Sequence, residues 1–253
     1  TGRDVHRFCL GLQNRNAGAV PKACSATILQ RMYNVPEIEN QLYTIDWEQV
    51  TGDLNRSGFA VVTGLLDVTQ CQRLIDGFDA EDGYRKTVVM ERHRYGLGRY
   101  KYWDYPLPES VQALRQRLYP KLVPIANCWM EQLRLEQRFP TQHDELQKVC
   151  HEHDQRQPTP LILEYGAGGH NTLHQDLYGD LYFPIQAACF LSEAGADYSG
   201  GAFVMTEQLP RAQSKPIVLT PRRGDMILLA TRFRPVKSTR GYCRATMRHG
   251  VSE

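Results

Sequence analysis

The stretch TLHQDLYGD, residues 172–180, contains a histidine and an aspartate two positions apart. If this stretch is a β-strand, His174 and Asp176 point to the same face, because side chains alternate along a strand. Gln175 then points to the opposite face. An imidazole and a carboxylate on one face would supply two of the three protein ligands of a metal site.

A third ligand is available near the end of the chain. His249, in the stretch MRHGVS, is the only histidine after His174. Two imidazoles and one carboxylate occupy one face of an octahedral metal and leave three positions open, which is the geometry of non-haem Fe(II) oxygenases. We therefore predict that His174, Asp176 and His249 form a catalytic metal centre. The alternative is a structural hydrogen bond between His174 and Asp176, with His249 unrelated to it.

The elements that must position these residues differ between the two halves of the chain. Helical patterns come first, and Pro120 and Pro124 are expected to kink or divide the longest of them. Short β-prone runs separated by Gly, Pro, Asn and Asp follow. This order predicts an α+β fold whose strands form a barrel or a double-sheet jelly roll. The predicted helices are about 44–58, 68–78, 109–136 and 141–154, and the predicted strands are about 59–66, 161–168, 183–193, 200–207, 214–221, 224–231 and 242–250.

Composition limits the function classes. The formal charge of the 253 residues is only +2, so nucleic-acid binding would need a local basic patch. The seven cysteines are scattered and form no Cys-x-x-Cys pair, which favours a reducing, intracellular setting (cytoplasm or nucleus) over a disulfide framework or a zinc ribbon. No apolar run is long enough for a membrane span, and the visible N-terminus has no signal-peptide core. We therefore expect no membrane association.

Several stretches after Thr44 match one family of proteins. They include VVMERHRYGLGRYKYWDYPLP, PTPLILEYGAGGHNTLHQDLYGD, SGGAFVMTEQLPRAQS, PRRGDMILLATRFRPVKSTRGY and RHGVS. Through them, the chain from about Thr44 to its end resembles the Fe(II)/2-oxoglutarate oxygenases of the Oxygenase-NA family, which are similar to AlkB-type repair dioxygenases. The resemblance implies a double-stranded β-helix (jelly roll) flanked by N-terminal helices. It also implies Fe(II) as the metal, 2-oxoglutarate and O₂ as co-substrates, and nucleic acid with alkylated bases as the partner to be demethylated.

The same resemblance divides the chain. Residues 1–43 are predicted to be an N-terminal arm, and residues 44–253 an oxygenase domain. Within that domain we expect helical support over about 44–155 and the jelly-roll core over about 158–253. Neither the role of the arm nor the oligomeric state follows from the sequence.

Two co-substrate contacts are implied by the resemblance. The stretch YGAGGHNTLHQD is similar to the Tyr-x-Pro-Gly…Leu-His-x-Asp stretch of AlkB-type enzymes, whose tyrosine helps to hold 2-oxoglutarate, and Tyr165 matches that tyrosine. The asparagine two residues before it is Leu163 here, so one contact is not reproduced. These enzymes also pair an arginine with the far carboxylate of 2-oxoglutarate. We expect that arginine beyond Glu253, because Arg244 and Arg248 have the opposite strand parity to His249.

Residues 91–103, ERHRYGLGRYKYW, interleave cations with aromatic side chains. Such residues hold phosphates and stack bases in enzymes that act on flipped nucleotides. The alternative is a hairpin with GLG as its turn and one face packed. Tyr178 follows Asp176 closely and would either contact substrate or pack. The substrate candidates are Tyr178, Arg94, Arg99, Tyr100 and Tyr102.

A second cationic stretch, TRFRPVKSTRGYCR at 231–244, would either line a groove for a polyanion or form a solvated edge loop. The predicted function is therefore a dioxygenase that demethylates alkylated bases. The near-neutral charge keeps open the same chemistry on a protein side chain or a small metabolite. A metal-binding jelly roll without turnover is the third hypothesis.

Overall fold

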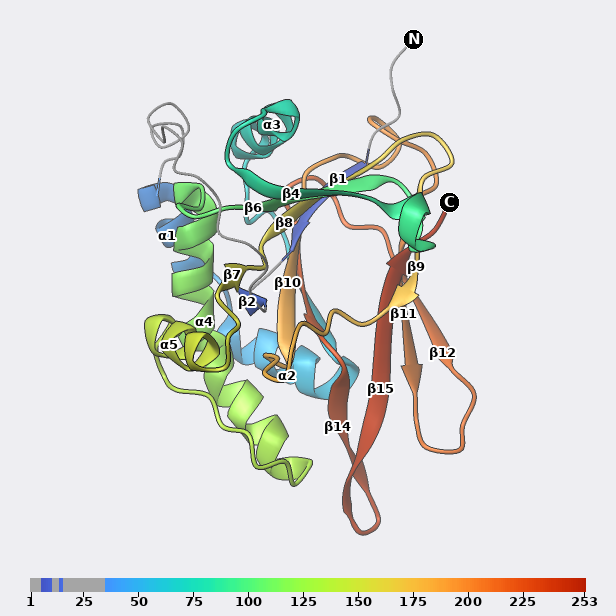
Figure 1. Cartoon of the computed structure of the whole chain (residues 1–253). Helices are drawn as coiled ribbons and strands as arrows, with labels where there is room; N and C mark the ends of the chain where they lie inside the picture. Colours follow the sequence, from blue (N-terminus) through green and yellow to red (C-terminus); the bar gives the residue numbers. More distant parts are fainter. Residues whose placement is uncertain (1–5, 11–13, 16–34) are drawn as a thin grey trace.

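The computed structural model describes residues 6–10, 14–15 and 35–253. Two antiparallel sheets form the core, and α1, α4 and α5 lie beside the larger sheet (Figure 1). The predicted α+β class, a jelly roll flanked by helices from the first part of the chain, is confirmed. In the described part of the chain, no helix is long and apolar enough to cross a membrane.

The larger sheet has seven strands in the order β3-β13-β10-β1-β8-β6-β4. Its central strands β10 and β13 are buried at every position, because other elements cover both of their faces. These strands are β3 (Phe59–Val62), β13 (Met226–Ala230), β10 (Ile185–Phe190), β1 (His6–Leu10), β8 (Leu161–Tyr165), β6 (Arg99–Trp103) and β4 (Tyr84–Val89).

Strand β1 comes from the segment that the sequence assigned to an N-terminal arm. It pairs antiparallel with both β8 and β10, so this part of the segment belongs to the sheet. A helix that the sequence suggested around residues 26–33 lies outside the described residues.

The smaller sheet has six strands: β12-β11-β15-β9-β5 follow one another in that order, and β14 pairs with β15 off this path. Along β15, His249, Met247 and Ala245 are buried, whereas Arg248 and Arg244 are exposed. The predicted parity of these residues is therefore confirmed. The bounds are β12 (Lys215–Leu219), β11 (Phe203–Gln208), β15 (Gly241–Val251), β9 (His170–His174), β5 (Gly96–Leu97) and β14 (Phe233–Ser238), with β2 (Asn14–Arg15) and β7 (Gln157–Pro158) as a separate pair.

Helices α2 to α5 begin and end close to the predicted positions, whereas α1 lies within the segment 1–43 that the sequence assigned to an arm. Asp46 caps the start of α2, and Gly58 ends it in the left-handed region at φ 76°. Helix α4 continues through Pro120 and Pro124 for 24 residues, so it is not divided. The elements are α1 (Val35–Tyr43), α2 (Trp47–Ser57), α3 (Val68–Asp76), α4 (Glu109–Gln132) and α5 (His143–Glu152), with 3₁₀ turns η2 (Gly77–Asp79) and η3 (Met90–His93).

Residues 91–103 do not form the hairpin that was the alternative for this stretch. Strand β5 belongs to the smaller sheet and β6 to the larger one, so the GLG segment crosses from sheet to sheet. Gly98 has a φ of 153°, and a Cβ there would lie 2.8 Å from the carbonyl oxygen of Glu164 and 2.8 Å from Tyr165 Cδ1. A side chain at this position would therefore prevent the crossing.

Candidate metal centre

The three predicted metal ligands meet at one point between the sheets. His174 ends β9, Asp176 follows two residues later, and His249 on β15 is the direct cross-strand partner of His174. Their ligand atoms all lie within 4.8 Å of one another. His174 Nε2 is 3.5 Å from Asp176 Oδ1, and His249 Nε2 is 3.3 Å from Asp176 Oδ2. Two imidazoles and a carboxylate converging in this way fit the donor set of an Fe(II) site with an open face.

A glycine allows β9 and β15 to approach closely at this site. The register of the two strands shifts between His249 and Val251. At Gly250, a Cβ would lie 2.5 Å from the carbonyl oxygen of Asn171 and 3.2 Å from the carbonyl carbon of Thr172. Real Cβ atoms essentially never come so close to backbone oxygen. Gly250 therefore permits the strand contact that sets His249 against His174.

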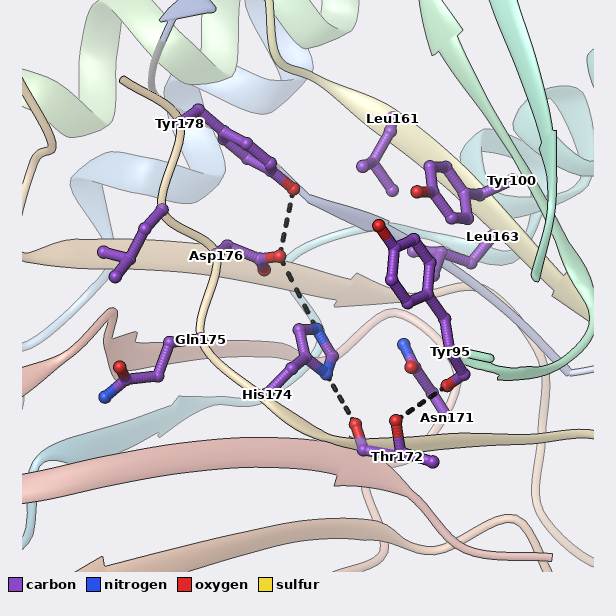
Figure 2. A pocket seen from close by; sticks show the side chains of 11 residues that line it. Tyr95, Tyr100, Leu161, Leu163, Asn171, Thr172, His174, Gln175, Asp176 and Tyr178 are labelled. Carbon is purple, nitrogen blue, oxygen red and sulfur yellow. Dashed lines mark hydrogen bonds and ion pairs between the residues drawn. The ribbon is translucent and has the colours of Figure 1, made fainter. Parts of the chain in front are cut away.

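A backbone carbonyl fixes the orientation of the His174 ring. His174 Nδ1 lies 2.7 Å from the carbonyl oxygen of Thr172, so Nδ1 carries the proton and donates it there (Figure 2). In the neutral ring, Nε2 is then unprotonated and faces Asp176, which is the tautomer required of a metal ligand. The His249 ring is 2% exposed and stacks on Phe203 at a centroid distance of 5.8 Å.

Each oxygen of the Asp176 carboxylate accepts a hydrogen bond from a neutral donor. The Tyr178 hydroxyl donates to Oδ1 at 3.0 Å, and Gln186 Nε2 donates to Oδ2 at 3.1 Å. Gln186 lies on β10 of the larger sheet, is 3% exposed, and has its Nε2 3.4 Å from His249 Nε2. Sequence reasoning missed Gln186, whose only signal was a polar residue within the apolar run IQAACF.

Burial and mutual charge set the protonation of the three groups. Burial would raise the pKa of Asp176, but the charges and hydrogen bonds of His174 and His249 hold that pKa well below its usual value. Burial would lower the pKa of His174, but the charge of Asp176 and its hydrogen bonds raise it overall. Burial and the charge of His174 lower the pKa of His249. The ionised carboxylate and the neutral His249 are the forms that bind metals.

A cavity of about 260 Å³ is lined by two of the three predicted ligands, His174 and Asp176. Tyr95 and Tyr100 face it from the side opposite Asp176, and Tyr178 borders it next to that carboxylate (Figure 2). Leu161 and Leu163 of the larger sheet form an apolar wall. Among the described residues that line it, none is Lys or Arg. The cavity is near the lower limit of roughly 300–1,000 Å³ for small-molecule sites.

The structure brings only some of the predicted substrate residues to the cavity. Tyr100 and Tyr178 line it, whereas Tyr102 is fully buried behind them with its hydroxyl 3.4 Å from that of Tyr178. Arg99 lies on the opposite side of β6 from Tyr100 and pairs with Glu164 at 2.6 Å.

Arg94 is exposed in a left-handed turn at φ 59° and is not part of the lining. Its neighbour Tyr95 does line the cavity and is 48% exposed. Tyr95 was not among the substrate candidates, although the aromatic and cationic stretch 91–103 that suggested the others also contains it.

Tyr165, the predicted 2-oxoglutarate contact, lies beneath the cavity. It is 2% exposed, burial raises the pKa of its hydroxyl, and a hydrogen bond with the Asn171 side chain opposes that rise. Asn171 in turn lines the cavity, so Tyr165 reaches the cavity through Asn171. The role of Tyr165 toward 2-oxoglutarate stays a prediction.

Comparison with known proteins identifies the family. Residues 98–253 match the model of Oxygenase-NA, described as an oxygenase catalysing oxidative methylation of damaged DNA. The chain belongs to the Oxygenase-NA family. The match agrees with the expected oxygenase class, and the convergence of His174, Asp176 and His249 agrees with the expected set of metal ligands.

Two uncharacterised proteins of Mycobacterium tuberculosis, from the strains CDC 1551 / Oshkosh and ATCC 25618 / H37Rv, are each 43% identical to the chain over 147 residues. That region is 58% of this chain and 63% of each relative, so the chain spans less than two thirds of their length. A Pseudomonas putida prolyl-4-hydroxylase is similar at 13% identity and a TM-score of 0.45, over 81% of this chain and 96% of that one. A Trichoplax adhaerens prolyl hydroxylase, solved with a peptide fragment of hypoxia inducible factor, has 12% identity and a TM-score of 0.43, over 87% and 91%.

Proposed function

We propose that the protein demethylates alkylated bases in nucleic acid by hydroxylating their N-methyl groups. The observation that carries the proposal is the convergence of His174, Asp176 and His249 beside a small cavity with aromatic walls. The family description, which concerns damaged DNA, supports the same substrate class. A role in DNA repair would follow from such a substrate.

His174, Asp176 and His249 are the residues that would hold Fe(II). When bound there with 2-oxoglutarate and O₂, the metal supplies the oxidant that hydroxylates a C–H bond. Asn171 is proposed to donate a hydrogen bond to 2-oxoglutarate from the cavity lining, and Tyr165 is proposed to act on 2-oxoglutarate by holding Asn171 from beneath. Neutral hydrogen-bond donors alone would hold the 2-oxoglutarate carboxylate less firmly than a guanidinium, because a guanidinium pairs with a carboxylate through two hydrogen bonds.

Oxidation of a methyl group removes it from the base. One oxygen atom of O₂ converts N–CH₃ to N–CH₂OH, while the other is incorporated as 2-oxoglutarate loses CO₂ and becomes succinate. The hydroxymethyl product then breaks its C–N bond, the nitrogen regains a proton, and formaldehyde leaves. The net result is demethylation.

The chain's own residues orient the reacting groups. Tyr178 and Gln186 hold the Asp176 carboxylate from two sides, which fixes the ligand face of the site. At the mouth, His93 stacks on the half-exposed Tyr95 at a centroid distance of 5.3 Å, giving an aromatic surface on which an extruded base can stack. The apolar wall of Leu161 and Leu163 would exclude water from the methyl group.

The test is formaldehyde and succinate release from oligonucleotides that carry N-methylated adenine or cytosine, with Fe(II) and 2-oxoglutarate present. We expect equimolar formaldehyde and succinate, and neither product with the His174→Ala variant. A panel of peptides and small N-methylated metabolites is assayed in parallel. Turnover of a peptide or a metabolite, with no turnover of the oligonucleotides, would refute the nucleic-acid substrate. It would favour the alternative substrates, a protein side chain or a small metabolite, which the near-neutral charge of the chain also allows.

A further inference from the structure

The outward face of the smaller sheet carries a group of cations that the metal centre does not use. Arg244 and Arg248 are exposed on β15, on the side opposite His249. On the neighbouring strand, Lys237 is exposed and pairs in register with Tyr242. We call Arg232, Lys237, Arg244 and Arg248, with Phe233 and Tyr242, the cationic face.

Among residues 35–253, no acidic side chain lies on the outward side of β12, β11, β15 or β14. The registers of β12, β11, β15 and β14 place neutral or cationic residues on the outward side, such as Thr206 opposite Arg248 and Pro235 opposite Arg244. The acidic residue of β11, Glu207, lies on the inward side and pairs with Arg234. Among residues 35–253, none of the four cations of the face forms an ion pair. Cations without counter-charges favour an anionic ligand.

Aromatic rings are interleaved with these cations. The guanidinium carbons of Arg232 and Arg244 lie 4.6 Å and 5.5 Å from the centroid of the Phe233 ring, so Phe233 lies close to both. Arg232 Nε is buried and has no hydrogen-bond partner within the described residues. Tyr242 is 46% exposed. A surface that alternates cations with stackable rings is typical of single-stranded nucleic-acid binding, in which cations follow phosphates and rings stack bases.

The cationic face is connected to the mouth of the cavity. Gln175, which lines the cavity, donates from Nε2 to the carbonyl oxygens of Arg232 at 3.1 Å and Met247 at 2.8 Å. The Arg232 guanidinium also lies 5.9 Å from the ring of Tyr182, in the segment after the ligand Asp176. The β14–β15 hairpin extends away from this point at the bottom of Figure 1. A strand with one base in the cavity would pass Arg232 and continue over the hairpin.

We propose that the cationic face binds the backbone of single-stranded nucleic acid whose extruded base enters the cavity. This inference rests on the proposed function. Arg244 and Arg248 are four residues apart on one strand, which separates their Cα atoms by roughly 13 Å. The face therefore spans several nucleotides and contacts phosphates independently of sequence.

The experiment measures binding of an unmethylated, fluorescently labelled single-stranded oligonucleotide as a function of salt. The test variant is Arg244→Gln/Arg248→Gln. The matched control is Lys121→Gln/Lys148→Gln, which removes the same charge from exposed positions of α4 and α5 beside the larger sheet. The test variant is expected to bind on the order of tenfold more weakly, and its slope of log affinity against log salt is expected to fall by about 1.4, since each lost phosphate contact contributes about 0.7. The control is expected to match the parent.

The outcomes separate this surface from the proposed function. Equal losses in the test and control variants would refute the face, because bulk charge would then explain binding. Binding of phosphatidylserine vesicles but not of oligonucleotides would also refute it. Loss of oligonucleotide binding with retained turnover of a free N-methylated nucleoside supports both proposals. If the parent protein binds the oligonucleotide but demethylates no nucleic acid, and the test variant loses binding, the result supports the face and refutes the proposed function.

Discussion

Strand β15 serves two different environments on its two faces. Inward, His249 is 2% exposed, has a lowered pKa and lies 3.3 Å from Asp176, which follows the neighbouring strand β9. Outward, its neighbour Arg248 is exposed and lacks an ion pair among the described residues. Because side chains alternate along a strand, one residue of register separates a metal ligand from a surface cation. The comparison predicts that substitutions at adjacent positions affect entirely different measurements.

The largest expected effect comes from His249→Ala. Removing one of three ligands leaves an incomplete site. We therefore expect the affinity for Fe(II) or Mn²⁺ to fall by more than about 100-fold, which exceeds the roughly 10–100-fold loss typical of changes to groups that only contact the ligands. Calorimetry under anaerobic conditions measures this affinity. Arg248→Ala, one position away on the opposite face, is the control and is expected to bind metal as the parent does. Equal metal affinity in the parent and in His249→Ala would remove His249 from the ligand set.

The glycine after His249 gives the next effect. In Gly250→Ala, a Cβ would lie 2.5 Å from the backbone oxygen of Asn171, so β9 and β15 must separate and His249 must move from His174. We expect the free energy of unfolding to fall by about 1–3 kcal/mol, as for overpacked sites, and metal affinity to fall with it.

The control for that substitution is Gly52→Ala in α2, where no atom lies within 4 Å of a built Cβ. An exposed helical glycine replaced by alanine is expected to gain about 0.5–1 kcal/mol of stability. Chemical denaturation of the two variants measures both values. A stable Gly250→Ala protein with unchanged metal affinity would show that the strand contact does not position His249.

The same distinction explains what the sequence could and could not predict. The pairing of His174 with Asp176 was predictable because their spacing and their ligand chemistry are local properties of residues 172–180, although β9 ends at His174 and Asp176 lies just beyond the strand. His249 was predictable because it is the only histidine after His174. Gln186 was not, because its hydrogen bonds to Asp176 come from the other sheet and its own strand is buried throughout. No periodic pattern distinguishes one polar residue in such a run.

The strand order was also beyond sequence pattern. Strand β1, from the predicted arm, lies between β8 and β10. It pairs there with residues more than 150 positions away in the sequence. The GLG segment looked like a turn because Gly is common in turns, but here its glycines allow close passage between the sheets. Both features depend on what the backbone approaches in space, and the local sequence carries no record of that.

The hydrogen bond from Gln186 is expected to tune the metal site without forming it. Gln186→Leu keeps the side-chain size but removes the donor to Asp176 Oδ2, and we expect metal affinity to weaken by about 10–100-fold. Gln208→Leu on the outward side of β11 is the control and should leave metal affinity unchanged. Thermal unfolding of both variants without metal shows whether folding contributes to the difference. Unchanged metal affinity in folded Gln186→Leu would show that Asp176 is held without Gln186.

The smallest effect belongs to the aromatic part of the cationic face and distinguishes stacking from charge. Tyr242→Ser removes an exposed ring but no charge, so oligonucleotide affinity should fall about fivefold, the lower end of the roughly 1–3 kcal/mol per stacked base. The salt dependence should stay that of the parent, because stacking releases no counterions. Lys237→Gln should also weaken binding, but it should in addition lower the salt slope by about 0.7, because a phosphate contact is lost. Tyr43→Ser, which removes an 81% exposed tyrosine at the end of α1, is the control and should change neither. If Tyr242→Ser alters the salt slope instead of the affinity at fixed salt, the ring does not stack a base, and the face binds phosphate alone.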